Sequence, residues 1–158
     1  MILMNLAGKI KGDCTLADHK DWITCDSFQI GANRAISFSG GGADRETSKP
    51  SITEAVITKS TDMASTELFV QAICGKSLGK AEIHFVQTAD EKMQTYLIYE
   101  LEDAIVSSYH QSSGGDRPTE SISLNFTKIT QTYNAFSGSQ VTPGTAKGWD
   151  LMASKRLP

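Results

Sequence analysis

The segment Lys59–Gly75, KSTDMASTELFVQAICG, contains the stretch of this chain whose pattern most clearly indicates a helix. Leu68, Phe69, Ala72 and Ile73 recur at helical spacing and predict one apolar stripe. A helix of about ten residues is too short to be stable alone in water, so we expect this stripe to pack against the surrounding strands.

Both ends of the helix, expected at about residues 65–74, carry residues typical of helix termini. Ser65 can accept a hydrogen bond from an unpaired backbone N–H, and Glu67 places negative charge near the positive end of the helix dipole. Gly75 suits the left-handed conformation that commonly ends a helix. These features predict a structural role for the helix and no chemistry.

Length and charge narrow the class of protein. The 158 residues favour a single domain, 1–158, with its own core. The 15 Lys and Arg against 18 Asp and Glu give a net charge of −3, which argues against nucleic acid as the main partner. No apolar run approaches the ~18–20 residues that span a bilayer, so no membrane insertion is expected.

The N-terminal sequence MILMNLAGKIKGD begins with apolar residues and reaches its first lysine only at Lys9. A signal peptide shows positive charge first and then a longer apolar region and a cleavage site. We therefore expect a first strand here and a protein made in the cytoplasm. Any export would use a route that reads no cleavable signal.

Most of the remaining chain alternates apolar and polar residues, as half-buried strands do. The predicted strands are Ile2–Ile10, Trp22–Ile30, Ile52–Lys59, Lys80–Thr88, Met93–Leu101, Ala104–Gln111 and Thr119–Thr127. About eight short strands and one helix predict a mainly β fold, a two-sheet β-barrel or sandwich with the helix packed against it.

The strand at Thr119–Thr127 has the clearest alternation and sets two further expectations. Ile122, Leu124 and Phe126 are predicted to point inward, and Glu120, Ser121, Ser123 and Asn125 to lie between them or outward. Ile129 breaks the alternation, which predicts a bulge near Lys128. Residues 137–158, rich in Gly, Thr and Ser, are expected to form a loosely anchored tail, with Trp149, Leu151 and Met152 as its anchors.

Residues 37–51, SFSGGGADRETSKPS, predict a long loop because they combine three glycines, four charges and a proline. Loops of this length in compact domains are usually functional. The loop lacks the Gly-Lys-Ser/Thr ending that a phosphate-binding loop places before a helix. Gly75-Lys76-Ser77 does carry these residues, but it follows the predicted helix, so no nucleotide cofactor is expected.

The candidate metal and thiol sites are weak. Cys14, Cys25 and Cys74 are odd in number and widely spaced, which favours reduced structural thiols over a disulfide framework. A zinc site built from Cys14, His19 and Cys25 would lack a fourth ligand and a familiar spacing. We expect no bound metal.

The candidate catalytic groups are equally weak. His110 lies near Ser112 and Ser113, but neither serine stands in the nucleophile pattern G-x-S-x-G. Glu100, Glu102 and Asp103 could supply the two carboxylates of a glycosidase, although adjacent acids are more typical of a solvated turn. Tyr96, Tyr99 and Tyr109 could stack on sugars, although strand tyrosines more often fill core or interface positions. The residues alone predict a β-rich domain without an evident active site.

The order and spacing of residues between Lys59 and Tyr133 resemble those of the haemolysin-coregulated protein (Hcp) family of the bacterial type VI secretion system. The matching residues are Lys59, Asp62, Ser65, Leu68, Gly75, Lys76, Tyr96, Leu97, Leu101, Ile105, Tyr109, Glu120, Ile122, Leu124, Phe126, Lys128, Ile129 and Tyr133. Gly8–Gly12 and the long loop before Ile52 also fit. Thr66 departs from the pattern, since the family often has proline there, and the N-terminus fits less well.

The resemblance implies a non-catalytic protein that assembles into hexameric rings stacked as the inner tube. Its implied partners are further copies of itself, a contractile sheath, a spike protein at the tube tip and small effectors in the lumen. It also implies secretion from the bacterial cytoplasm through the type VI system. The alternatives are a monomeric β-sandwich that binds carbohydrate and, less well supported, a glycosidase-like enzyme.

One hypothesis concerns ring stacking. The loop that contains Gly40, Gly41, Gly42, Asp44, Arg45 and Glu46 carries charges of both signs. We expect it to reach the adjacent ring and to order when rings stack. A solvated hairpin tip is the alternative.

Overall fold

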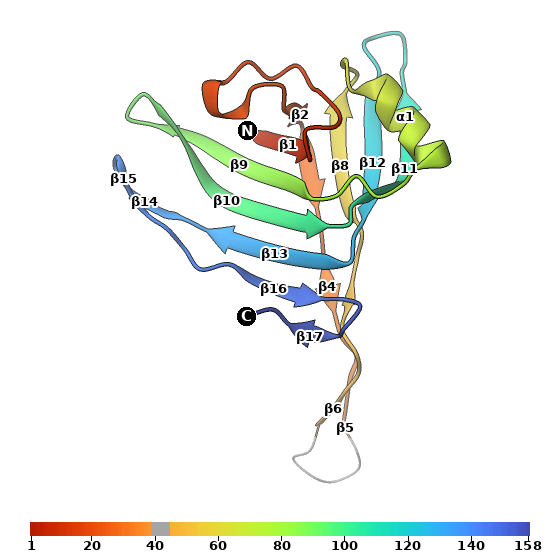
Figure 1. The fold of residues 1–158 in the computed structure, drawn as a ribbon, viewed down its shortest axis with the longest axis vertical. Coiled ribbons are helices and arrows are strands. Elements are labelled where there is room, and N and C mark those ends of the chain that lie inside the picture. Colours follow the sequence, from red (N-terminus) through yellow and green to blue (C-terminus); the bar gives the residue numbers. More distant parts are fainter. Residues whose placement is uncertain (39–44) are drawn as a thin grey trace.

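Alternating apolar residues build two antiparallel sheets that face each other across one core, as Figure 1 shows. The computed structural model of the chain describes residues 1–38 and 45–158. The strands of the two sheets run in clearly different directions, and one α-helix lies beside the smaller sheet. The predicted mainly β sandwich with one helix is therefore confirmed. No sheet closes into a barrel within the described ranges.

The larger sheet has seven strands in the spatial order β17-β16-β13-β10-β9-β1-β2. Their bounds are β1 (Ile2–Leu6), β2 (Ile23–Cys25), β9 (Ala81–Ala89), β10 (Lys92–Glu102), β13 (Lys128–Tyr133), β16 (Lys147–Asp150) and β17 (Lys155–Arg156). Residues 137–158, expected as a loosely anchored tail, thus supply β16 and β17 at one edge of this sheet. Trp149 lies in β16, opposite Ile129 of β13.

The smaller sheet has four strands in the order β11-β12-β8-β3. Their bounds are β3 (Ser27–Gln29), β8 (Ala55–Ser60), β11 (Ile105–Ser112) and β12 (Thr119–Asn125). Three two-stranded ribbons pair β4 (Ala32–Asn33) with β7 (Ser51–Ile52), β5 (Ile36–Phe38) with β6 (Arg45–Thr47), and β14 (Ala135–Ser137) with β15 (Gln140–Thr142). A short 3-10 helix, η1, spans Ala17–His19.

One expected strand and the expected bulge prove to be places where the chain passes between the sheets. The predicted strand Trp22–Ile30 divides at Asp26, because β2 belongs to the larger sheet and β3 to the smaller one. The predicted bulge near Lys128 is instead the short connection from β12 back to β13. The register shifts that the structure does show lie at Tyr96 in β10 and Ser107 in β11.

The helix α1 (Ser65–Cys74) has the predicted bounds, but only part of its predicted stripe is buried. Leu68 is fully buried and Ala72 packs against the core, whereas Phe69 and Ile73 are exposed. A short helix beside a sheet edge contacts the sheet along a narrow line, so the outer half of a broad stripe stays outside the core.

Both predicted helix ends differ in detail. Ser65 is the first helical residue and not the cap; its hydroxyl oxygen accepts the backbone N–H of Asp62 (2.9 Å), and Asp62 Oδ1 accepts that of Ala64 (2.9 Å). Gly75 is extended (φ −61°) and not left-handed. A Cβ added there would lie 2.1 Å from the Gln71 carbonyl oxygen in the last turn of α1, so glycine is required at this position.

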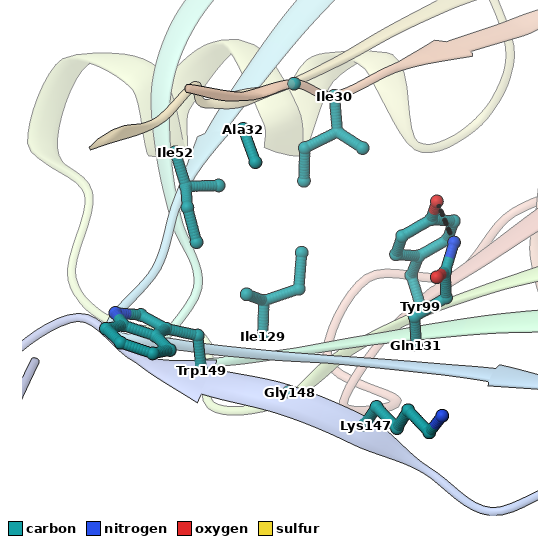
Figure 2. Close-up of a pocket in the computed structure, with 10 residues that line it drawn as sticks. Ile30, Ala32, Ile52, Tyr99, Ile129, Gln131, Lys147, Gly148 and Trp149 are labelled. Carbon is teal, nitrogen blue, oxygen red and sulfur yellow. Dashed lines mark hydrogen bonds between the residues drawn. The ribbon is translucent and has the colours of Figure 1, made fainter. Parts of the chain in front are cut away.

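The core fills the space between the sheets with inward residues such as Met4, Ile57, Ile83 and Leu124. Near the β4–β7 ribbon the sheets diverge and leave an open groove of about 320 Å³, shown in Figure 2. Ile30, Ala32 and Ile52 form one wall of the groove, and Tyr99, Ile129 and Trp149 line the other.

Candidate functional site

The outward face of the four-stranded sheet is lined mainly by small polar side chains. The strand registers place on this side Ser27, Gln29, Val56, Thr58, Ser60, Ile105, Ser108, His110, Ser112, Thr119, Ser121, Ser123 and Asn125. We call this surface the hydroxyl face. Within these four fully described strands it contains no Lys, Arg, Asp or Glu, and Glu54, which precedes β8 and accepts a hydrogen bond from Ser107 Oγ, is the acidic residue at its margin.

The outward face of the seven-stranded sheet is charged where β9, β10 and β13 adjoin, and it is apolar where Leu3 and Val86 lie. Glu82 lies directly opposite Glu100, and Glu102 lies opposite Lys128. Lys80 Nζ lies 2.8 Å from Glu100 Oε1, and this hydrogen bond is the main reason why the pKa of Glu100 is lowered. We call this surface the charged face.

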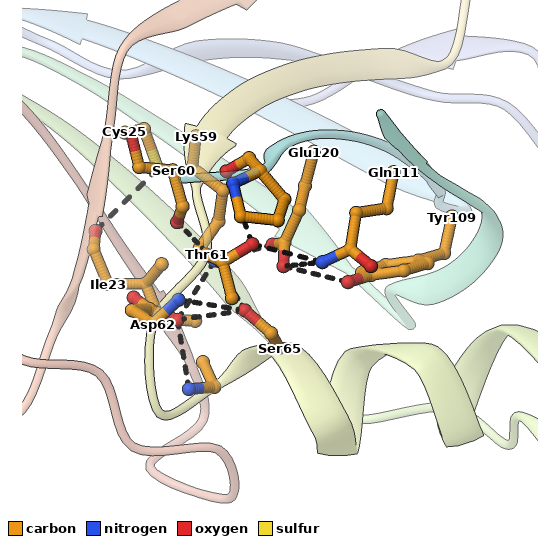
Figure 3. A network of polar contacts seen from close by, with 12 residues as sticks. Ile23, Cys25, Lys59, Ser60, Thr61, Asp62, Ser65, Tyr109, Gln111 and Glu120 are labelled. Atoms are coloured by element: carbon orange, nitrogen blue, oxygen red, sulfur yellow. Dashed lines mark hydrogen bonds and ion pairs between the residues drawn. The ribbon is translucent and has the colours of Figure 1, made fainter. Parts of the chain in front are cut away.

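Beneath the hydroxyl face, the smaller sheet buries a network of charged and polar side chains, shown in Figure 3. Lys59 of β8 and Glu120 of β12 are cross-strand neighbours with fully buried side chains, and Lys59 Nζ lies 2.6 Å from Glu120 Oε2. Lys59 Nζ also lies 2.9 Å from Asp62 Oδ1 and donates to Ser65 Oγ (3.2 Å). The network therefore ties both central strands to the start of α1.

The second oxygen of Glu120 is also occupied. Its Oε1 accepts hydrogen bonds from Tyr109 OH (2.7 Å) and Gln111 Nε2 (3.4 Å). Burial acts to raise the pKa of Glu120, but the hydrogen bonds from Lys59 and Tyr109 outweigh it and hold this pKa below its usual value. Burial and the bond to Glu120 raise the pKa of Tyr109 in turn.

The inward position of Glu120 corrects the sequence expectation. Glu120 was predicted to lie between the apolar residues or outward, yet it shares the inner face with Ile122 and Leu124. Its spacing of two from Ile122 already indicates this face. Lys59 follows Ile57 at the same spacing, so both buried charges were detectable from strand parity once they were considered as a pair.

The carboxylates considered for a glycosidase are engaged in separate surface contacts. Glu100 pairs with Lys80, Glu102 lies 3.5 Å from Lys128, and Asp103 accepts a hydrogen bond from Thr127 Oγ1 (2.9 Å). A glycosidase acid needs a raised pKa so that it can stay protonated, whereas the pKa of Glu100 is lowered. This geometry does not support glycoside hydrolysis.

The residues considered for zinc are divided between two clusters. Cys14 packs with Leu3 and Val86, whereas Cys25 lies in the main core, where burial raises its pKa to about 12. His19 turns to His84, with His19 Nε2 2.9 Å from His84 Nδ1. Within residues 1–38 and 45–158, no group of three or more His, Cys, Asp or Glu side chains could hold a metal ion.

His110 and the nearby serines form no nucleophile–base arrangement. His110 lies on the hydroxyl face opposite Ser121, and Ser113 donates its hydroxyl to the Asp116 carbonyl (2.6 Å). Gly75-Lys76-Ser77 leads from α1 toward β9 and not into a helix, so it lacks the geometry of a phosphate-binding loop.

The tyrosines considered for sugar stacking are half-buried and used internally. Tyr99 packs between Phe28 and Phe85 and accepts a hydrogen bond from Gln131, and Tyr109 donates to Glu120. Tyr96 contacts Phe85. They do not form the exposed aromatic row that the carbohydrate-binding alternative predicts.

Most of the expected ring-stacking residues lie outside the described residues. These are Gly40, Gly41, Gly42 and Asp44, whereas Arg45 and Glu46 belong to β6. The chain that the structure describes contains no helix long and apolar enough to cross a membrane.

Comparisons with known proteins agree on the family that this chain resembles. The sequence model of the family described as "Type VI secretion system effector, Hcp" matches residues 3–133. The protein hcp1 of Pseudomonas aeruginosa is 27% identical over 107 residues, which are 65% of this chain and 66%, just under two thirds, of that protein.

Solved structures agree with the family match. A structure described as a type six secretion system protein is 28% identical, with 99% of this chain and 98% of that chain covered and a TM-score of 0.88. Hcp1 from Salmonella typhimurium is 23% identical, with coverage of 99% and 97% and a TM-score of 0.76, and it supports the fold alone.

Proposed function

The chain belongs to the Hcp family of type VI secretion proteins, and from this premise we propose that it is a subunit of the secretion system's inner tube. In this role six copies close into a ring, rings stack into a tube, and the tube is secreted from the bacterial cytoplasm. Heterologous contacts between identical subunits close into rings when the rotation between them allows it.

The hydroxyl face is the observation that carries this proposal. A sheet face exposed to bulk solvent normally carries charged residues, as the charged face does. A tube wall has a different requirement: strongly charged walls would hold cargo of opposite charge and repel cargo of the same charge. We assign the hydroxyl face to the lumen, where small effectors travel, and the charged face to the outside, toward the sheath.

The role is structural and not catalytic. The carboxylates, histidines and cysteines that chemistry would need are separated or already paired in the described chain. The buried network of Lys59 and Glu120 holds α1 and the two central strands together, which suits a subunit that must keep one shape.

The stacking loop remains part of the proposal. The β5–β6 ribbon that leads to it extends away from both sheets in Figure 1, which would let residues 40–46 reach a neighbouring ring. Removing residues 40–48 should leave single rings and abolish long tubes. Tubes of unchanged length in negative stain would contradict this role for the loop.

Ring formation itself is tested by negative-stain imaging of the purified protein. The proposal predicts rings with an open centre and six-fold symmetry. Fields of small solid particles at every concentration would overturn it.

A further inference from the structure

The outer side of α1 is an apolar surface that the described residues leave largely uncovered; only Phe69 has an edge contact among them, with Tyr109. Phe69, Val70 and Ile73 are 53%, 44% and 70% exposed, and they follow Thr66 at spacings of three, four and seven residues. This is the spacing at which one helix face presents anchors to a groove in another protein. We call Phe69, Val70 and Ile73 the helix ridge.

The groove of Figure 2 is the complementary feature. Its two walls are apolar and face each other across an open gap of about 320 Å³, with Ile30 and Ile52 opposite Ile129 and Trp149. Well-packed interiors rarely leave such a space between apolar walls. The described residues of the monomer leave it unfilled, so a second molecule could insert side chains there.

The two surfaces lie at opposite edges of the same sheet. The helix α1 packs against β11, the strand at one edge of the four-stranded sheet. β3 forms the other edge, and Ile30, Gly31 and Ala32 of the groove follow it directly along the chain. A head-to-tail ring needs two different, complementary surfaces on opposite sides of each subunit.

The charges of the two surfaces also match. Glu67, which is exposed, is the only charged residue within α1. Lys147 lines the groove, and Arg156 lies opposite Trp149 on the neighbouring strand, both with exposed side chains. An acidic helix flank would therefore meet a basic groove rim, which favours docking of unlike surfaces over pairing of two helices.

We propose that the helix ridge of one subunit inserts into the groove of its neighbour and is the contact that closes the ring. This inference rests on the proposed ring, whose existence the test below measures separately. A stable interface buries roughly 1,200–2,000 Å², more than one short helix face provides, so the sheet edges beside the ridge and groove join the contact.

Cross-linking can test this pairing because Cys74, at the end of α1, is exposed, whereas Cys14 and Cys25 are buried. The variant Ala32→Cys adds a thiol at an exposed position in the groove. A short bis-maleimide should then join neighbouring subunits into a covalent ladder of up to six chains. Wild type, with Cys74 alone, and Ala32→Cys/Cys74→Ser, with the groove thiol alone, should give no ladder.

Each other outcome overturns the proposal. Rings seen by light scattering without a ladder would mean that the ring closes through other surfaces, and the tube function would stand. Covalent dimers of wild type through Cys74 would mean that two helices pair with each other. Monomers alone, without rings or cross-links, would overturn the docking and the tube function together.

A second variant pair measures how much the ridge contributes. Phe69→Glu places a charge in the apolar contact and should raise the concentration for half-assembly about tenfold or more. Val141→Glu, at an exposed apolar residue of β15, is the matched control and should assemble as wild type does. Equal assembly of the two variants would contradict the proposal.

Discussion

The two sheets place their charges in opposite ways. The four-stranded sheet buries Lys59 and Glu120 on its inner face and presents hydroxyl groups outside, whereas the seven-stranded sheet keeps its ion pairs, such as Lys80–Glu100, on the outside. A buried pair depends on complete pairing, while an exposed pair is screened by water. We infer that the inner ions fix the subunit's shape and that the outer hydroxyl groups leave one face neutral.

Removing the lysine of the buried pair and the lysine of the exposed pair should produce the largest difference in unfolding free energy between the two sheets. Lys59→Met leaves the Glu120 carboxylate buried without its cation and should cost about 3–5 kcal/mol of unfolding free energy. Lys80→Met, the matched control on the charged face, should cost about 1 kcal/mol or less. Chemical denaturation of both variants measures the difference.

A double variant shows whether the loss comes from charge or from packing. Lys59→Met/Glu120→Gln removes the stranded charge and should recover part of the stability that Lys59→Met loses. If Lys59→Met were no less stable than Lys80→Met, the buried pair would not have the structural importance given to it here.

The second largest effect should come from low pH, which destabilises the larger sheet through His84 of β9. Burial, together with the neighbouring His19, lowers the pKa of His84 to about 4, and burial also lowers that of His19. In the unfolded chain a histidine has a pKa of about 6.5, so below that pH the unfolded chain binds protons that the folded one excludes. The stability is complete above pH ~6.5 and falls by up to about 3 kcal/mol for His84 as pH drops to 4.

Replacing the histidines one at a time assigns this pH dependence. His84→Gln should flatten the slope of unfolding free energy between pH 6.5 and 4. His19→Gln should flatten it too, because burial also lowers the pKa of His19. An equal slope in wild type and His84→Gln would show that the pair is not responsible.

A gold label on each face compares the two faces directly. The cysteine substitutions that carry the label should have the smallest effect on stability. In a Cys74→Ser background, Ser123→Cys and Glu82→Cys should each change unfolding free energy by about 0.5 kcal/mol or less. A gold cluster attached to residue 123 should appear in the centre of ring images, and one at residue 82 at the outer rim. The reverse pattern would exchange the faces assigned to lumen and exterior.

Local patterns predicted much of this fold because strand parity and helix caps depend on short stretches of chain. The helix bounds at residues 65–74 and the inward set of Ile122, Leu124 and Phe126 are confirmed. The alternation of residues along this strand also indicates that Glu120 points inward, as Ile122 does. The prediction placed Glu120 between the apolar residues or outward because an unpaired charge is costly to bury. Its partner lies 61 residues away, and only tertiary structure shows the pairing.

The features that local patterns could not predict depend on distant parts of the chain. The spacing of Phe69 and Ile73 indicates an apolar stripe but not whether the core or another molecule covers it. The groove requires β4, β7, β13 and β16 to come together, from residues more than a hundred positions apart. The division of the expected strand Trp22–Ile30 at Asp26 likewise depends on two sheets that the local pattern does not show.

The central claim, that this chain is a ring-forming tube subunit, is tested most directly by native mass measured with light scattering over a range of concentrations. The account predicts a species of about six times the chain mass of 17.1 kDa. A mass of one chain at every concentration would contradict it and would favour a monomeric binding module.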